Sequence, residues 1–409
     1  MSDPSAPPAT STAFAAIDWA AMVIGSPRAD GSAPNAATPA VSNSPVAAPV
    51  GTTTTHTYEL DSDGDVLLVL HNSPFILPVC LEDLLSVHLN GRLLFTNTSL
   101  GTTFTGRTLR IKASSKHLTL AFPYFRRMLS SGFREGTELR NNGQVEIDTE
   151  EARTVPFLLL MLIVHSRTKH VPMAVSLEML TDIAVLVDYY ECYDAVEVFA
   201  NLWIAGLEKD VPLCSTPVDN GAVSKKALSW LFISWVFRKK SIFERMTKFL
   251  LCYSKDKISD GGLPIPGAIL EKLNQSRTDL ITLILAALDK VHSNARQGCL
   301  LSISGYAFAP SQAETELCTY VVFGALTKQL MDKRLILPTP DPPYPGFSIV
   351  DLLAECRDIK SPHIGSFPST TAHAKCSAGT RLRLALGRIF EPGGFDLDSE
   401  EFKQLRAGR

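Results

Sequence analysis

Three short segments between residues 58 and 148 carry the apolar patterns of β-strands. The run VLLVL after Asp65 has the length and β-branched content of a buried strand, whereas RIK (110–112) and QVEID (144–148) alternate as half-buried strands do. Alternation places Val145 and Ile147 on the inner face of the last strand. The pattern therefore predicts a small sheet whose second and third strands are separated by helical chain.

An amphipathic helix is expected directly after the second strand. Ser114 and Ser115 stand at its start, where a serine hydroxyl caps free backbone N–H groups. Apolar residues then recur at three- and four-residue spacing and are expected on one helix face. These residues are Leu118, Ala121, Phe125, Met128 and Leu129.

Mainly helical patterns follow the third strand. VPFLLLMLIV (155–164) is about half as long as a membrane-spanning helix, so it predicts a core helix with Pro156 near its start, and no membrane partner. Two segments with one apolar stripe each predict a further pair of helices, at 176–189 and 193–207. Beyond them, helical spacing recurs at 228–250, 269–291, 317–330 and 349–356.

Changes in composition divide the chain. Residues 1–55, rich in Ala, Pro, Ser and Thr, are expected to form a disordered tail. An ordered α+β region is expected over 56–207, with an insertion at 71–106 in which Asn90-Gly91 predicts a hairpin turn. A proline-containing break follows. The remaining predicted divisions are a linker at 208–224, an all-α C-terminal domain at 225–360 and an extension of undecided order at 361–409.

Composition and charge narrow the functional classes. With 409 residues, 45% of them hydrophobic, the chain can build sizeable cores in two domains. A net charge of −3 gives no overall basic field, so direct binding to nucleic acid is not expected. The N-terminus has no secretory pattern, so an intracellular location, cytoplasmic or nuclear, is expected. In that reducing environment most of the eight cysteines are expected to be small buried hydrophobes.

The sequence carries none of the common enzyme signatures. We find no GxSxG elbow, no GxxxxGK[ST] phosphate loop, no HExxH and no GxGxxG opening a helix. A non-enzymatic protein that uses no cofactor is therefore expected.

The order of elements over 58–207 resembles the BTB (POZ) domain, in particular its fungal-type members. Asp65–Val69 is similar to the first strand of that family, Ile111–Phe125 to its strand-to-helix segment ending in Tyr-Phe, and Val145–Ile147 to its third strand. The runs SSKHLTLA, FRRML, HxRT and IAVLVDYYEC are also typical of these members. The resemblance implies an α+β fold with a small mixed sheet flanked by helices, followed by helices only.

Membership of this family would imply a protein-interaction module that forms a homodimer. In BTB adaptors, a loop with an apolar residue, any residue and Glu contributes to docking on the cullin scaffold of ubiquitin ligases, and FRE (133–135) is similar to that loop. A dimerising scaffold or transcription-related factor without a ligase role is the alternative. The partner-binding residues expected on this basis are Tyr124, Phe125, Met128, Phe133 and Glu135.

The sequence leaves the position of the Phe133 side chain open. As an exposed residue at the tip of a helix-to-strand connection it would be a desolvated anchor, with Glu135 setting the register of the partner. Alternatively, Phe133 packs back on the core and Glu135 is solvated.

A zinc site in the C-terminal region is an alternative of another class. Its candidate ligands are Cys299, Cys318, His373 and Cys376. Structural zinc ligands usually come as two close pairs, and only His373 and Cys376 form one here. The other interpretation is two buried helix cysteines and an exposed tail.

Overall fold

The structure of the protein is a computed structural model. It describes residues 55–71, 77–78, 103–104, 108–130, 132–149, 153–213, 222–299, 311–336, 339–360, 376–387 and 393–407. The predicted disordered tail lies outside these residues except for Thr55, and so do the predicted hairpin at Asn90-Gly91 and His373. Most of the predicted insertion and part of the predicted linker also lie outside them.

One four-stranded sheet has the order β1-β5-β2-β6, formed by β1 (Thr55–Glu59), β5 (Thr108–Ala113), β2 (Val66–His71) and β6 (Val145–Thr149). β2 runs antiparallel to β5 and parallel to β6, so the sheet is mixed, as predicted. The inner face of β6 is also as predicted, since Val145 and Ile147 are buried. β1 runs parallel to β5 and was not predicted. A separate antiparallel pair joins β3 (Leu77–Pro78) to β4 (Thr103–Phe104).

Pro123 divides the predicted single helix into two. α1 (Ser115–Ala121) ends at Phe122, whose φ of −120° and ψ of 109° are extended, and α2 (Pro123–Leu129) begins at the proline. Proline has no N–H to continue the first helix, and its ring disfavours helical backbone at the preceding residue. The prediction of one continuous helix was therefore wrong. Its predicted inner residues are nevertheless buried at three of five positions: Leu118, Phe125 and Leu129.

Asp65 and His165 fix the start of α1 on the sheet. The Asp65 carboxylate accepts from the N–H of Ser115 at 2.7 Å and from its hydroxyl at 2.6 Å, so a residue beside β2 caps the helix. The Ser114 hydroxyl makes no cap hydrogen bond, contrary to prediction. The N–H of Ser114 donates to Nε2 of His165 at 2.9 Å, and Nδ1 lies 2.9 Å from the Met161 carbonyl oxygen.

The same histidine must be neutral to make both contacts. Nε2 accepts a hydrogen bond from Ser114, so the ring proton is on Nδ1 and donates to Met161. Burial lowers the pKa of His165 below its ordinary value. His165 and His170 are both buried.

Three helices follow β6. α4 (Thr154–Val164) is buried along almost its whole length, as predicted for a core helix with Pro156 in its first turn. α5 (Leu177–Tyr190) and α6 (Tyr193–Leu207) are the predicted pair and both pack against α4. Short 3-10 turns at Thr168–His170 and Glu208–Asp210 follow α4 and α6.

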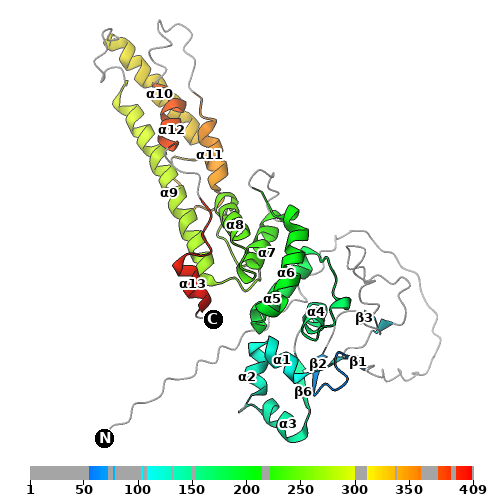
Figure 1. Ribbon diagram of the computed structural model, residues 1–409. Coiled ribbons are helices and arrows are strands. Elements are labelled where there is room, and N and C mark those ends of the chain that lie inside the picture. Colours follow the sequence, from blue (N-terminus) through cyan, green and yellow to red (C-terminus); the bar gives the residue numbers. More distant parts are fainter. Residues whose placement is uncertain are drawn as a thin grey trace, which may run out of the picture. The chain divides into compact units, whose positions relative to one another are not determined.

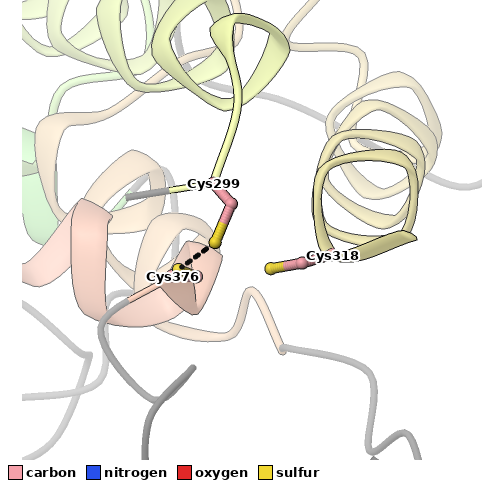
Figure 2. A group of neighbouring side chains, drawn as sticks. All are labelled: Cys299, Cys318 and Cys376. Atoms are coloured by element: carbon pink, nitrogen blue, oxygen red, sulfur yellow. Dashed lines mark hydrogen bonds between the residues drawn. The ribbon is translucent and has the colours of Figure 1, made fainter. Parts of the chain in front are cut away.

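The described residues beyond 213 contain helices and connections only, as predicted. α9 packs against both α10 and α12 (Figure 1), and three cysteines meet beside these helices (Figure 2). None of the helices in the described residues combines the length and hydropathy needed to cross a membrane. The helices are α7 (Ala222–Val236), α8 (Lys240–Tyr253), α9 (Gly267–Gln297), α10 (Gln312–Asp332), α11 (Ile349–Arg357), α12 (Ala378–Leu386) and α13 (Glu400–Ala407).

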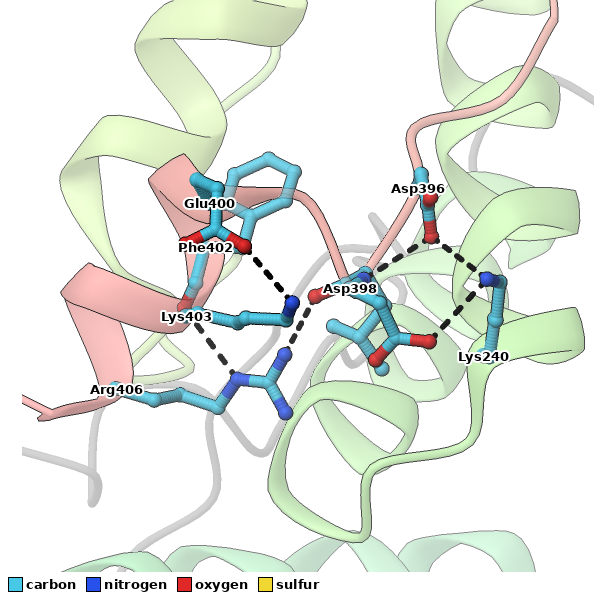
Figure 3. Close-up of polar contacts among 8 residues, drawn as sticks. Lys240, Asp396, Asp398, Glu400, Phe402, Lys403 and Arg406 are labelled. Atoms are coloured by element: carbon cyan, nitrogen blue, oxygen red, sulfur yellow. Dashed lines mark hydrogen bonds and ion pairs between the residues drawn. The ribbon is translucent and has the colours of Figure 1, made fainter.

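The segment around α13 returns to α7 and α8, although the sequence left its order undecided. Phe402 is fully buried, with its ring 5.5 Å from that of Phe243 and 6.3 Å from that of Trp235. Lys240 at the start of α8 pairs with Asp396 at 3.0 Å and Asp398 at 3.2 Å (Figure 3). α13 therefore completes the core of the α7–α8 pair.

Arg277 is the largest buried charged side chain of the described helical region. Its side chain, 1% exposed, points from the middle of α9 to two connections that lack helical hydrogen bonds. The guanidinium donates to five backbone carbonyl oxygens at 2.6–2.9 Å. Two belong to the connection after α8, and three belong to the connection before α11. The acceptors are the carbonyls of Ser254, Lys255, Pro343, Tyr344 and Phe347.

Replacing Arg277 by methionine is expected to destabilise the helical region by about 3–5 kcal/mol, because five backbone carbonyl groups of the two connections lose their hydrogen bonds from the guanidinium. Urea unfolding followed by circular dichroism measures the free energy. Arg296→Met, at an exposed position of the same helix, is the control and should change it by less than about 0.5 kcal/mol. Similar stability of the two variants would show that Arg277 does not hold these connections.

The neutral state of His165 predicts a pH dependence of stability. Its folded pKa lies below the ordinary value of 6.5, so the unfolded chain binds more protons as the pH falls through that value. The unfolding free energy should therefore decrease from about pH 7.5 to about pH 5.5. His165→Gln should flatten this slope in urea titrations at each pH. His117→Gln should keep it, because His165 and both its hydrogen bonds remain. Equal slopes in His165→Gln and the unchanged protein would contradict the assignment.

Candidate partner-binding site

Phe133 is exposed, and it lies between two helices. It is the N-cap residue of α3 (Arg134–Asn142) and 56% of its surface is accessible, so the exposed alternative is the one observed. The prediction that Phe133 lies in a helix-to-strand connection was wrong, since α3 comes between Phe133 and β6. Glu135 lies in the first turn of α3, where a carboxylate is favoured by the helix dipole.

Gly136 fixes where α3 begins. A Cβ atom at this position would lie 2.2 Å from the Ser130 carbonyl oxygen and 2.7 Å from that of Leu129. Only glycine allows the first turn of α3 to approach the end of α2 so closely. The exposed Phe133 side chain is therefore presented from a close helix-to-helix junction.

The predicted residues on α2 differ in their exposure. Phe125 is 1% exposed and its ring stacks on Tyr190 with the centroids 5.6 Å apart, so it is a core residue with no surface for a partner. Tyr124 and Met128 are half-buried and reach the surface. Helical spacing places a residue on a face but does not tell how deeply that face is covered.

Tyr124 forms an aromatic pair with Tyr189 at the end of α5. Their ring centroids are 5.5 Å apart, and Tyr189 is 58% exposed. Burial, followed by a hydrogen bond with the Tyr189 hydroxyl, raises the pKa of Tyr124 to about 12. Negative charge on Glu135 acts in the same direction, which places Glu135 near this pair. The Tyr124 phenol therefore stays protonated at neutral pH and can act as a hydrogen-bond donor.

Arg127 and Glu191 connect α2 to the end of α5. Two guanidinium nitrogens lie 2.7 and 3.1 Å from the two carboxylate oxygens, a bidentate pair. The hydrogen bond with Arg127 lowers the pKa of Glu191. Glu191 is the C-cap residue of α5 with a left-handed φ of 57°, and the ion pair helps to hold that conformation.

We call these residues the α2–α5 surface. It combines exposed aromatic rings, an arginine and carboxylates, a composition typical of protein interfaces and their hot spots. Its residues are Tyr124, Arg127, Phe133, Glu135, Tyr189 and Glu191.

Tyr189 was not among the predicted partner-binding residues, although the helical pattern of α5 contained a signal for it. The inner stripe of α5 passes through Ile183 and Val187, and Tyr190 continues it. Tyr189 therefore falls on the outer face, where a large aromatic residue marks a candidate contact. Arg127 and Glu191 are far apart in the sequence, and no local pattern could pair them.

Three of the four candidate zinc ligands meet in the helical region. Cys299 follows the end of α9, Cys318 lies on α10 and Cys376 precedes α12. All three are buried, their Sγ atoms lie within 4.8 Å of one another, and the side chains point toward a common centre (Figure 2). A hydrogen bond with Cys376, together with burial, raises the pKa of the Cys318 thiol. His373 lies outside the described residues.

Comparison with known proteins gives no relative for this chain. No protein-family model, no curated protein and no solved structure matches it. The chemistry of the α2–α5 surface and of the cysteine cluster is therefore the basis for inferring function.

Proposed function

We propose that this chain is a non-enzymatic protein-interaction module of the BTB type, which binds protein partners through the α2–α5 surface. The order of elements supports the resemblance: β2 and β5 pair antiparallel, α1 and α2 follow, and β6 returns parallel to β2 before a helical series. The observation that carries the proposal is the exposed Phe133 side chain. It is presented beside Glu135 from a closely packed helix junction.

The physical case for binding rests on desolvation. Phe133 is 56% exposed and next to a helix start, so a partner groove that covers the exposed part of the ring gains about 1–1.5 kcal/mol from its burial. Glu135 follows Phe133 by two residues, and Arg127 and the tyrosine hydroxyls offer further polar contacts on the α2–α5 surface, which would set register and exclude wrong partners. The partner we propose is the cullin scaffold of a ubiquitin ligase, with the C-terminal helices recruiting the target.

Self-association is the second part of the proposal. Leu120 on α1 is 77% exposed, so its side chain is available to an apolar interface. A second copy of the chain is the partner we propose, because BTB domains commonly pair through an extended apolar interface.

Replacing Phe133 and Glu135 together by alanine is expected to abolish cullin recovery in affinity purification of the full chain. Loss of the central anchor and its polar neighbour should weaken binding at least about tenfold. The matched control is Met173→Ala with Glu178→Ala, an exposed apolar residue and a first-turn glutamate of α5. Recovery should be unchanged in this control.

Two results would count against the ligase adaptor. If the Phe133 and Glu135 variant recovers as much cullin as the unchanged chain, the α2–α5 surface is not the binding site. If the unchanged chain recovers none, the adaptor role is wrong, and the dimerising scaffold becomes the function to test.

Leu120→Asp is expected to weaken self-association at least about tenfold, because a charge would be buried in an apolar interface. Sedimentation of the full chain should show twice the 44.6 kDa chain mass, and the variant should shift toward the single-chain mass. Met173→Asp, which changes another exposed apolar residue, should stay dimeric. A monomeric unchanged chain, or a variant that dimerises equally well, would contradict this assignment.

A further inference from the structure

The three cysteines of the helical region form their own small cluster. Cys299, Cys318 and Cys376 pack against one another and against the partly buried Val322, separately from the main hydrophobic core. Cys192 and Cys356 behave differently, since both are part of the main core among aliphatic and aromatic side chains. Filling of apolar space explains why Cys192 and Cys356 are buried. It does not explain why the other three cysteines lie together.

The distances within the cluster are those of ligands around one ion. Two sulfurs bound at about 2.3 Å to one tetrahedral zinc lie about 3.8 Å apart. The Sγ atoms of Cys299 and Cys376 are 3.5 Å apart, and all three Sγ atoms lie within 4.8 Å of one another. A disulfide requires about 2.05 Å between sulfurs, so the observed spacing is far beyond a covalent bond.

We propose that Cys299, Cys318 and Cys376 are three ligands of a structural zinc ion. Thiolate sulfur is a ligand that zinc prefers, and burial of all three side chains is typical of a structural site. Binding replaces three thiol protons by one divalent cation, so the buried sulfurs become thiolates and the metal reduces their combined charge from −3 to −1. Among the described residues, the three cysteine sulfurs are the group of ligand atoms close enough to share an ion. A tetrahedral site needs one further donor.

The ion would add a direct link between three helices at this point. Cys299 comes immediately after Gly298, the C-cap residue of α9 with a φ of 136°. Cys376 directly precedes Ser377, whose side chain caps α12, and it is 77 residues from Cys299. Cys318 is on the inner side of α10. One zinc ion would thus fix the end of α9, the first half of α10 and the start of α12.

Metal analysis of the full chain, expressed with zinc in the medium, tests the proposal. One zinc per chain is expected. Cys318→Ser should weaken zinc binding at least about 100-fold in competition with a chromogenic chelator, since loss of a direct ligand exceeds the effect of an outer-shell change. The matched control is Cys356→Ser, a buried cysteine of the main core, which should keep its zinc.

Four further measurements separate loss of a ligand from loss of folding. Circular dichroism and the sedimentation mass should be unchanged in Cys318→Ser. Cobalt-substituted protein should show the d–d absorption of tetrahedral thiolate coordination, and X-ray absorption should give three sulfur neighbours at about 2.3 Å. These signals should be present in Cys356→Ser and absent in Cys318→Ser.

Three results would overturn the zinc site. One is unchanged protein that contains no stoichiometric zinc and takes up none on titration with Zn²⁺. Another is Cys318→Ser that binds zinc as tightly as the unchanged chain. The third is a Cys299–Cys376 disulfide in the protein as purified, found by peptide mapping without reductant. None of these results bears on cullin recovery, so this inference and the proposed function fail separately.

Discussion

The arrangement of the helical region depends on one buried guanidinium. The connections after α8 and before α11 turn backbone carbonyl groups toward α9, and such groups need hydrogen-bond donors where they are buried. Arg277 supplies donors to all five, and the fixed planar fork of its side chain orients both connections at once. A lysine at this position would offer a compact ammonium group, which lacks the planar fork that orients two connections. α8, α9 and α11 can therefore share one core only because α9 brings this charge inside.

In the sheet region, other side chains satisfy backbone groups that have no partner within their own helix. The first turn of α1 has N–H groups that no residue of its own helix can satisfy. Asp65, beside β2, accepts from Ser115, and the neutral ring of His165 accepts from Ser114. The start of α1 is thus fixed by partners from a strand edge and from the end of α4. This anchored helix leads into α2, so buried polar contacts help to position the α2–α5 surface.

Local patterns predicted the elements that depend on local physics. Val145 and Ile147 were placed correctly because alternation follows directly from strand geometry. The break at Pro123 was readable from residue type, but the apolar spacing on both sides suggested continuity. Arg277 could not be recognised, since an arginine at that point of an amphipathic helix is usually solvated. The same limit applied to the site: exposure of Phe133 and proximity of Tyr189 depend on how α2, α3 and α5 pack.

The return of α13 to α7 and α8 sets an order for folding during synthesis. The N–H of Phe395 donates to the Thr247 hydroxyl at 2.8 Å across 148 residues of sequence, and Phe402 fills the space beside Phe243. At about 5–20 residues per second, the ribosome needs roughly 7–30 s to supply the segment that covers this face. For that interval the aromatic side of α7 and α8 is open to solvent. The nascent chain is then a natural substrate for chaperones that bind exposed apolar surface.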